Sequence, residues 1–166
     1  TFKTRFSFFF GTDIPAQFSF GSSVRETSLP RKADELSDVD YMIVFNTSSR
    51  IFKPQTYLDR LRRFAENYYS SSEIHQSNPT VMLELDHIKF DLVPAISQYS
   101  QYQIPSPASS WSEWISTDPN GFSQQLTDAN TRNNFQIKPL VRLIKYWNSR
   151  NGHLYTTFSL EQNIVA

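Results

Sequence analysis

The sequence predicts an α+β domain, in which a mixed sheet with flanking helices leads into a helical C-terminal region. Runs typical of buried strands alternate with segments of helical periodicity. The strand-like runs are 38–45, 81–85 and 88–93, and the helical segments are 56–69 and 137–147. Because only Asp86 and His87 separate the last two strand-like runs, we expect a tight antiparallel hairpin, which argues against a doubly wound parallel sheet.

The N-terminal half supports this outline. Phenylalanines crowd the first 20 residues, and we expect them in the core because aromatic side chains dominate buried area. Thr56 with Asp59 forms a capping-box-like start for the first helix. Pro94 is expected to close the second strand of the hairpin, since proline cannot donate a ladder hydrogen bond.

The C-terminal half begins with a polar connection. Residues 97–121 are rich in Ser, Pro and Gln and predict a long irregular segment that contains Trp111 and Trp114. The second helix should end at residues 151–152, an Asn-Gly pair. Another apolar segment, typical of a helix, begins at Thr157.

The composition limits the classes of function. The 16 basic and 16 acidic residues cancel, so a nucleotide would have to be held by a local patch or by metal ions rather than by bulk charge. Hydrophobic residues at 39% and charged residues at 19% exclude disordered and fibrous proteins. The absence of cysteine excludes thiol catalysis, disulfides and cysteine zinc sites.

The 166 residues match the usual length of one domain. We expect a cytoplasmic protein with no membrane partner, because the sequence has no signal peptide and no apolar run of membrane-spanning length. The chain begins at Thr1 rather than Met and stops directly after an apolar segment, so we expect it to be part of a longer polypeptide or its ordered portion. Within it we expect a core over 1–120 and the start of a helical C-terminal region, cut short, over 121–166.

Asp38 and Asp40 are the strongest candidates for chemistry. In an extended chain, residues two apart point to the same face, so both carboxylates should project from one side of the strand. Two close carboxylates repel unless positive charge lies between them, and Mg²⁺ prefers carboxylate, phosphate and water oxygens. Asp91 lies inside the second hairpin strand, where a charge is costly unless it is paired or binds metal. If the two strands are neighbours, three carboxylates converge within reach of two metals about 3.5–4 Å apart.

The alternative for these residues is solvation. Asp38 and Asp40 would then be exposed aspartates at the entrance of a strand. Asp91, like Lys89 on the same face, would point to solvent from a half-exposed sheet.

Two further positions are candidate phosphate contacts. Glycine in the Gly21-Ser22 pair allows close backbone approach, and successive N–H groups in such a turn bind anions, although an ordinary tight turn has the same sequence. Lys145 lies on the flank of a helix whose apolar face carries Ile144 and Trp147. That pattern favours a solvated surface lysine over a point charge that binds a triphosphate.

Other catalytic motifs are missing from the sequence. The residues His75, His87 and His153 lack metal-ligand spacing and are assigned no role. There is no nucleophile elbow, P-loop or dinucleotide-binding glycine motif.

Taken in order, the Gly-Ser turn, the Asp-x-Asp pair and the third aspartate resemble the polymerase-β-like nucleotidyltransferase superfamily. Residues 21–27 are similar to the "GS…GT" segment of its oligoadenylate-synthetase and cGAS-like branch, with Glu26 in place of the common glycine. Residues 139–148 resemble the "LhKxW" helix of bacterial cGAS/DncV-like nucleotidyltransferases, and 117–119 and 156–161 are similar to that family's "tDP" turn and "SSFxLE" segment. The resemblance covers about residues 18–161.

The resemblance implies a polymerase-β-like nucleotidyltransferase catalytic core over 1–120 that joins NTPs with release of pyrophosphate. The product implied is a cyclic di- or trinucleotide second messenger in anti-phage defence. The implied cofactors are two Mg²⁺ or Mn²⁺ ions held by Asp38 and Asp40, with Asp91 completing the ion that activates the attacking ribose hydroxyl.

The same resemblance implies a set of residues that hold the triphosphate. They are Gly21, Ser22, Lys145 and Thr157, the last in place of the family's serine. NTPs are the implied substrates and a regulatory protein is an implied partner, whereas long nucleic acid is not expected as an obligate partner.

Two other functions stay open. The same fold could modify RNA, a small molecule or a protein, because the sequence defines no acceptor pocket. A non-catalytic nucleotide-binding module is the third reading, and it is disfavoured because a binding protein has no need of the costly cluster formed by Asp38, Asp40 and Asp91.

Overall fold

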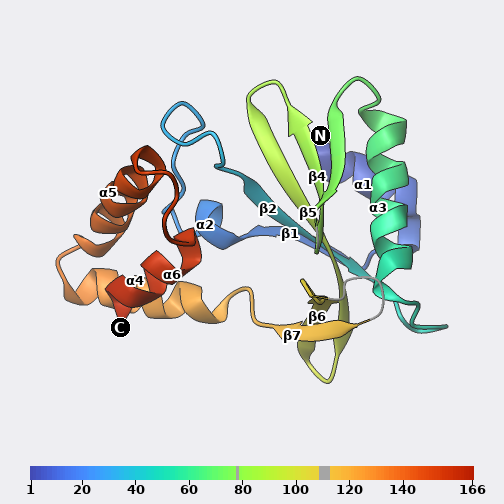
Figure 1. The fold of residues 1–166 in the computed structure, drawn as a ribbon. Coiled ribbons are helices and arrows are strands. Elements are labelled where there is room, and N and C mark those ends of the chain that lie inside the picture. Colours follow the sequence, from blue (N-terminus) through green and yellow to red (C-terminus); the bar gives the residue numbers. More distant parts are fainter. Residues whose placement is uncertain (78, 109–112) are drawn as a thin grey trace. The chain divides into compact units, whose positions relative to one another are not determined.

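The computed structural model of the chain describes residues 1–77, 79–108 and 113–166 (Figure 1). A mixed sheet with flanking helices confirms the predicted α+β class. Trp111, which was expected in an irregular connection, lies outside the described residues. Within the described residues, no helix combines the length and the apolar character required to span a membrane.

The chain divides into two compact units. The first unit comprises residues 1–19 and 39–118, and the second comprises residues 20–38 and 119–166. The segment 20–38 therefore packs with the C-terminal helices, although it precedes most of the sheet in sequence. The functional boundary expected at residue 120 stays a prediction.

The first unit is built on a seven-stranded sheet with the order β1-β2-β5-β4-β3, to which β6 and β7 are added through β5. The strands are β1 (Ala16–Phe20), β2 (Val39–Phe45), β3 (Glu73–Ser77), β4 (Thr80–Leu85), β5 (Ile88–Gln98), β6 (Gln101–Pro105) and β7 (Trp114–Thr117). β2 and β5 are parallel, whereas β3–β4, β4–β5, β5–β6 and β6–β7 are antiparallel pairs. The hairpin predicted across Asp86 and His87 is confirmed, since Leu85 pairs with Ile88.

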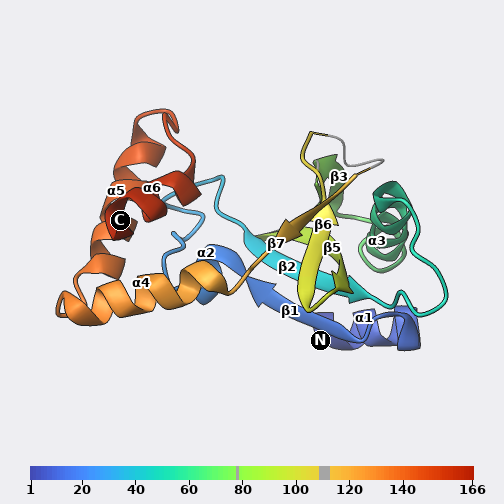
Figure 2. The same ribbon diagram turned by 90° about the horizontal axis from the view of Figure 1, so that it is seen from below.

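The aromatic core of this unit covers one face of the sheet. The helices α1 (Phe2–Phe10) and α3 (Pro54–Tyr68) lie along the same side of it, as Figure 2 shows, and the single 3₁₀ turn η1 (Gly11–Asp13) follows α1. The stacked rings of Phe6 and Phe64, with centroids 3.9 Å apart, join the two helices. Tyr41, Ile43 and Phe45 of β2 belong to this core. The expectation that the N-terminal phenylalanines pack in the core is confirmed for Phe6 and Phe10, whereas Phe8 is exposed.

The second unit is helical. It contains the short α2 (Gly21–Val24) and the longer α4 (Gly121–Arg132), α5 (Ile137–Arg150) and α6 (Thr157–Val165). α5 ends before the Asn-Gly pair at 151–152, as expected, and α6 begins at Thr157. The side chain of Thr156 caps α6 by accepting a hydrogen bond from the backbone N–H of Ser159 at 3.3 Å.

Several local predictions are wrong. The first long helix begins at Pro54 after Lys53, with no side-chain cap, so Thr56 and Asp59 lie inside it rather than forming a capping box. β5 continues through Pro94 to Gln98. On the edge away from β2, Pro94 lies between Leu92, where the pairing with β4 ends, and Ile96, where the pairing with β6 begins, so the strand tolerates proline there. The described part of the segment 97–121 holds the end of β5 and the strands β6 and β7, where an irregular connection was expected.

Candidate active site

Asp40 and Asp91 are direct neighbours on the sheet. They are register partners on the parallel strands β2 and β5, so their side chains leave the same face. Because Tyr41 and Leu92 belong to the aromatic core, the alternation of strand side chains places Asp40 and Asp91 on the opposite face from α1 and α3. Both side chains are half-buried. The expected neighbourhood of these two strands is therefore confirmed.

This pair has the donor chemistry that Mg²⁺ prefers, since both side chains offer carboxylate oxygens on adjacent strands. Asp91 makes further interactions, and its Oδ1 atom is buried without accepting a hydrogen bond among the described residues. The residues present fit a divalent cation. No cluster of three or more His, Asp or Glu side chains that could hold a metal occurs in the described part of the chain, so the structure does not assemble all three aspartates into one such cluster.

A pocket of about 440 Å³ lies within the second unit. Asp38, Lys145 and Thr157 line it, so the structure brings together three of the expected site residues in one cavity. The other lining residues are Leu29, Asp34, Leu36, Ser37, His153, Leu154, Tyr155 and Thr156. Gly21 and Ser22, although described, are not among them. The lining thus combines a lysine, two aspartates and a helix N-terminus with three leucines.

Lys145 is buried, contrary to the expectation of a solvated lysine. Its side chain is 4% exposed and donates a hydrogen bond to Oε1 of Glu161, which is fully buried in α6. The expectation failed because α5 buries the face defined by Val141, Lys145 and Asn148, while Trp147 is 49% exposed. Burial lowers the pKa of Lys145, and the Glu161 carboxylate opposes that shift.

Glu161 connects Lys145 to the segment after α2. The guanidinium of Arg25 donates from Nε to Oε2 of Glu161 at 2.7 Å, and Thr27 donates from its hydroxyl to Oε1 at 2.6 Å. Arg25 also lies over the rings of Phe122 and Phe158, at 5.5 and 5.6 Å from their centroids. These contacts hold the guanidinium in one orientation, with its charge on the carboxylate.

Gly21 and Glu26, which lie in the loop before Thr27, both have a positive backbone φ. Gly21 is buried with φ 72°, a left-handed conformation that glycine adopts without strain. The carbonyl of Ser22 accepts a hydrogen bond from the backbone N–H of Thr27 at 3.0 Å, which closes the loop. Glu26, which replaces the glycine common in the resembling family, also has a positive φ of 61°. At position 26 the loop therefore has the left-handed backbone conformation that favours glycine, although the residue is a glutamate.

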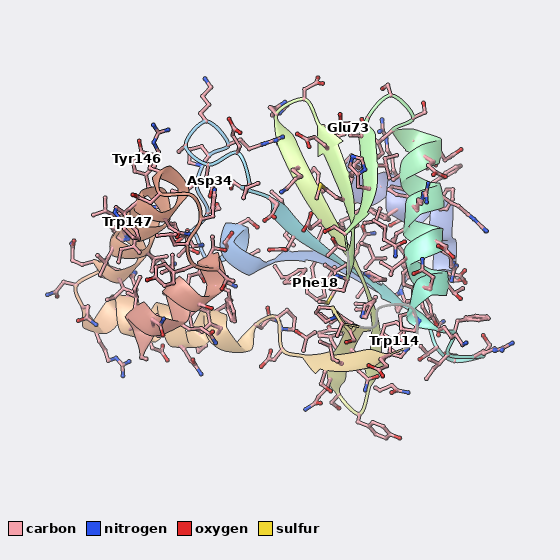
Figure 3. All side chains as sticks on the ribbon, viewed as in Figure 1. Phe18, Asp34, Glu73, Trp114, Tyr146 and Trp147 are labelled. Atoms are coloured by element: carbon pink, nitrogen blue, oxygen red, sulfur yellow. The ribbon has the colours of Figure 1, made fainter. Side chains whose placement is uncertain are left out.

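Asn148 of α5 holds the wall of the pocket. Its Nδ2 donates to the backbone carbonyl of Tyr155 at 2.9 Å, and its Oδ1 accepts from the Tyr155 N–H at 3.1 Å. Asp34 and His153 also line the pocket, and Oδ1 of Asp34 lies 3.5 Å from Nε2 of His153. Figure 3 marks Asp34 in the segment before β2 and Tyr146 and Trp147 on α5.

Sequence reasoning missed four buried residues that support the pocket without lining it: Arg25, Thr27, Asn148 and Glu161. One signal was available for Glu161, because it is the only charged residue in the apolar helical segment that begins at Thr157. A carboxylate on the buried side of such a helix needs a cationic partner. Nothing in the local pattern identified Arg25 or Asn148.

The mixed sheet with its in-register aspartates and flanking helices defines a polymerase-β-like nucleotidyltransferase fold. Residues 3–130 match the Second Messenger Oligonucleotide or Dinucleotide Synthetase domain. The chain belongs to this family, and it shares the fold of bacterial DncV.

Two curated relatives are similar in sequence. A probable cyclic nucleotide synthase of Bacillus cereus (strain VD146) is 28% identical, over 88% of this chain and 53% of the relative. A cyclic AMP-AMP-AMP synthase of an Acinetobacter species (strain ATCC 27244 / 9458) is 26% identical, over 84% of this chain and 40% of the relative. The chain thus spans about half the length of the curated relatives it matches.

Solved structures share the fold. The Elizabethkingia meningoseptica CdnE cyclic dinucleotide synthase, solved with GTP and Apcpp, superposes with a TM-score of 0.75 at 16% identity and covers 98% of this chain and 65% of that one. Vibrio cholerae DncV bound to 3′-deoxy GTP gives a TM-score of 0.72 at 14% identity, over 90% of this chain and 43% of that one.

Proposed function

We propose that the protein containing this chain is a metal-dependent nucleotidyltransferase that joins NTPs into a cyclic di- or trinucleotide. The observation that carries the proposal is the in-register pair Asp40 and Asp91, on the sheet of a chain that belongs to a second-messenger synthetase family. The names of the two curated relatives, both synthases of cyclic nucleotides, support the product class.

In this proposal Asp38, Asp40 and Asp91 hold two divalent cations, Mg²⁺ or Mn²⁺. Such ions would lower the pKa of the attacking ribose hydroxyl and offset the negative charge of the triphosphate. Asp38 and Asp40 would serve both ions, and Asp91 would complete the coordination of the ion nearer the hydroxyl. Carboxylates on rigid strands suit this role because their spacing is set by the sheet.

The pocket of the second unit would receive the triphosphate. Lys145 supplies a positive charge from α5, and Thr157 supplies an exposed hydroxyl at the N-terminal end of α6. Helix N-termini attract phosphate because their backbone N–H groups and the helix dipole face outward. Gly21 and Ser22 would add backbone N–H groups and a hydroxyl. Two observations support this assignment. Lys145 and Thr157 line the same pocket, and Gly21 has a left-handed conformation that allows close approach of its backbone.

The reaction would transfer a nucleotidyl group. A ribose hydroxyl of one nucleotide attacks the α-phosphorus of an NTP, the new phosphodiester bond forms, and the bond to the β,γ-pyrophosphate breaks. The hydroxyl proton leaves toward solvent, and Lys145 with Thr157 would stabilise the negative charge that accumulates on the departing pyrophosphate. A second transfer closes the ring of a dinucleotide, and a trinucleotide needs a third, with one pyrophosphate released at each step.

The biological role belongs to the same proposal. Second-messenger synthesis in anti-phage defence is supported by the family resemblance. A regulatory protein partner is supported by a fold relative, the CdnC of E. coli MS115-1, whose structure has been solved in a complex with HORMA-deltaN.

Product analysis tests the proposal. The protein is incubated with all four NTPs, Mg²⁺ and Mn²⁺, and the products that resist phosphatase and nuclease are identified by mass spectrometry. We expect a cyclic oligonucleotide formed from NTPs alone. A product that appears only when RNA, a small molecule or a protein is added would favour a transferase with another acceptor. Nucleotide binding without turnover would favour a non-catalytic module.

A further inference from the structure

Glu161 is a fully buried carboxylate whose contacts reach far beyond its own helix. It is 0% exposed and lies four residues after Thr157 in α6, about one turn along the helix. Its two oxygens accept hydrogen bonds from Lys145, Arg25 and Thr27. Burying the Glu161 carboxylate without such partners would lower the stability of the fold. Helix α6 therefore needs these hydrogen bonds in order to pack with Glu161 on its buried side.

These partners belong to the parts of the second unit that surround the proposed phosphate site. Lys145 comes from α5 and lines the pocket. Thr27 closes the loop onto Ser22 through its backbone N–H, while its hydroxyl donates to Glu161. A single carboxylate therefore ties the lysine, the Gly21-Ser22 loop and the helix that carries Thr157 to one another.

Two cations share the Glu161 carboxylate, since Arg25 and Lys145 both form ion pairs with it. The carboxylate of Asp38 also lines the pocket and is a second negative charge that acts on Lys145. Arg25 is held on the carboxylate by two aromatic rings, at 5.5 and 5.6 Å. Lys145 is the cation that lines the pocket, and an ammonium group has three donors, of which one is directed to Glu161. The remaining donors of this ammonium group can therefore serve an anion bound in the pocket.

We infer that Glu161 is a positioning residue for the triphosphate, which acts through Lys145 by fixing its ammonium group at the pocket. The inference rests on the proposed function, because it assigns the anion in the pocket to the phosphates of an NTP. Without the Glu161 carboxylate, Lys145 would lose the acceptor that fixes its ammonium group. The ammonium N–H groups would then point toward the space left by that carboxylate or toward solvent, and away from the phosphates.

A double-mutant cycle tests the inference. Binding of inorganic tripolyphosphate with Mg²⁺ is measured by isothermal titration calorimetry, so that the result does not depend on base preference. The proteins are the wild type, Glu161→Gln, Lys145→Met and the double variant, each first shown to be folded by circular dichroism. We expect each single variant to bind about tenfold more weakly. The double variant should lie within about twofold of Lys145→Met, because Glu161 acts through that lysine.

A second substitution and a control complete the design. Glu161→Asp keeps the charge and should retain more binding than Glu161→Gln, and it replaces that variant in the cycle if the amide prevents folding. Glu26→Gln is the matched control, because Glu26 is an ion-paired glutamate in the same unit whose side chain is 72% exposed. It should change tripolyphosphate binding by less than about twofold.

The outcomes separate the two claims. If the wild type binds neither tripolyphosphate nor any NTP, the proposed function and the inference both fail. If the wild type binds and Glu161→Gln binds equally well, only the inference is overturned. It is also overturned if the losses of the two single variants multiply in the double variant, since Glu161 would then act independently of Lys145.

Discussion

The substitution Asp91→Asn should stabilise the metal-free protein while it removes activity. Asp91 and Asp40 are register partners on parallel strands, and their side chains share one half-buried face of the sheet. Without a cation, two carboxylates in this position repel each other. Asparagine has almost the same shape, and its amide can donate a hydrogen bond to the carboxylate of Asp40.

The magnitude follows from the spacing of the strands. Neighbouring strands lie about 4.8 Å apart, so two charges about 5 Å apart repel by about 3 kcal/mol at an effective dielectric constant of about 20. In bulk water the same repulsion is about 0.8 kcal/mol. Because both groups are half-buried, and Asp91 makes other contacts that asparagine would alter, we expect Asp91→Asn to raise the free energy of unfolding by about 1 kcal/mol.

The assay is urea denaturation with EDTA and again with saturating Mg²⁺. A cation that binds only the native wild type at about 100 times its Kd should add about 2.7 kcal/mol. We expect the wild type to gain most of this and Asp91→Asn to gain little of it, so that the order of stability reverses when Mg²⁺ is added. Phe64→Ala, in the aromatic core on the opposite face, serves as a control that should keep the gain from Mg²⁺.

The reasoning would be refuted by two results together. One is an Asp91→Asn variant that is less stable than the wild type in EDTA. The other is a gain from Mg²⁺ that is the same in both proteins. The aspartates would then be ordinary half-exposed residues of the sheet, as in the alternative based on solvation.

Three further predictions concern single residues. Lys145→Met should weaken NTP binding about ten- to a hundredfold in calorimetry, because a charge-assisted hydrogen bond to phosphate is lost, and unchanged affinity would remove this residue from the site. The same variant should lower the urea midpoint only moderately, since Glu161 keeps Arg25 and Thr27 as partners, and a complete loss of folding would contradict this. Glu26→Gln tests pH dependence: the hydrogen bond from Lys138 lowers the pKa of Glu26 below 4.5, so this contribution to stability is present above that pH and is lost as the pH falls through the lowered value. The urea midpoints of the wild type and Glu26→Gln should therefore converge on acidification, and a constant difference would exclude the ion pair as the cause.

Strong local patterns made part of the fold predictable. The aspartates of β2 and β5 lie in runs of apolar residues, so the strands were evident. Their pairing was only a condition of the metal-site hypothesis, suggested by the cost of an isolated charge. The hairpin between β4 and β5 followed from the two-residue spacing. Parallel pairing in a given register has no local signal, because it depends on contacts between distant segments.

Other elements could not be predicted, for a different physical reason. The strands β6 and β7 are short and, except for Pro105, not buried, and they are held by cross-strand pairing rather than by an apolar pattern. Helix α4 buries only Leu126, Ala129 and Asn130, so its periodicity is weak.

Lys145 shows the limit of amphipathic patterns at a polar site. The apolar residues Leu140, Val141, Ile144 and Trp147 suggested one buried face. Val141 is buried as that pattern predicts, yet Leu140 and Trp147 are exposed. The buried face instead carries Lys145 and Asn148, whose partners lie on α6 and in the segment before it. Hydrophobic periodicity cannot reveal a face that is stabilised by ion pairs and hydrogen bonds, because those depend on residues elsewhere in the chain.

Pyrophosphate release from NTPs tests the central claim most directly, namely nucleotidyl transfer that depends on the aspartates. The wild type is incubated with all four NTPs and Mg²⁺, and pyrophosphate is measured beside the number of phosphodiester bonds formed. We predict one pyrophosphate for each bond, none in EDTA, and a rate at least about a hundredfold lower for Asp40→Asn and Asp91→Asn. Orthophosphate in place of pyrophosphate, or wild-type rates in both folded variants, would contradict the account.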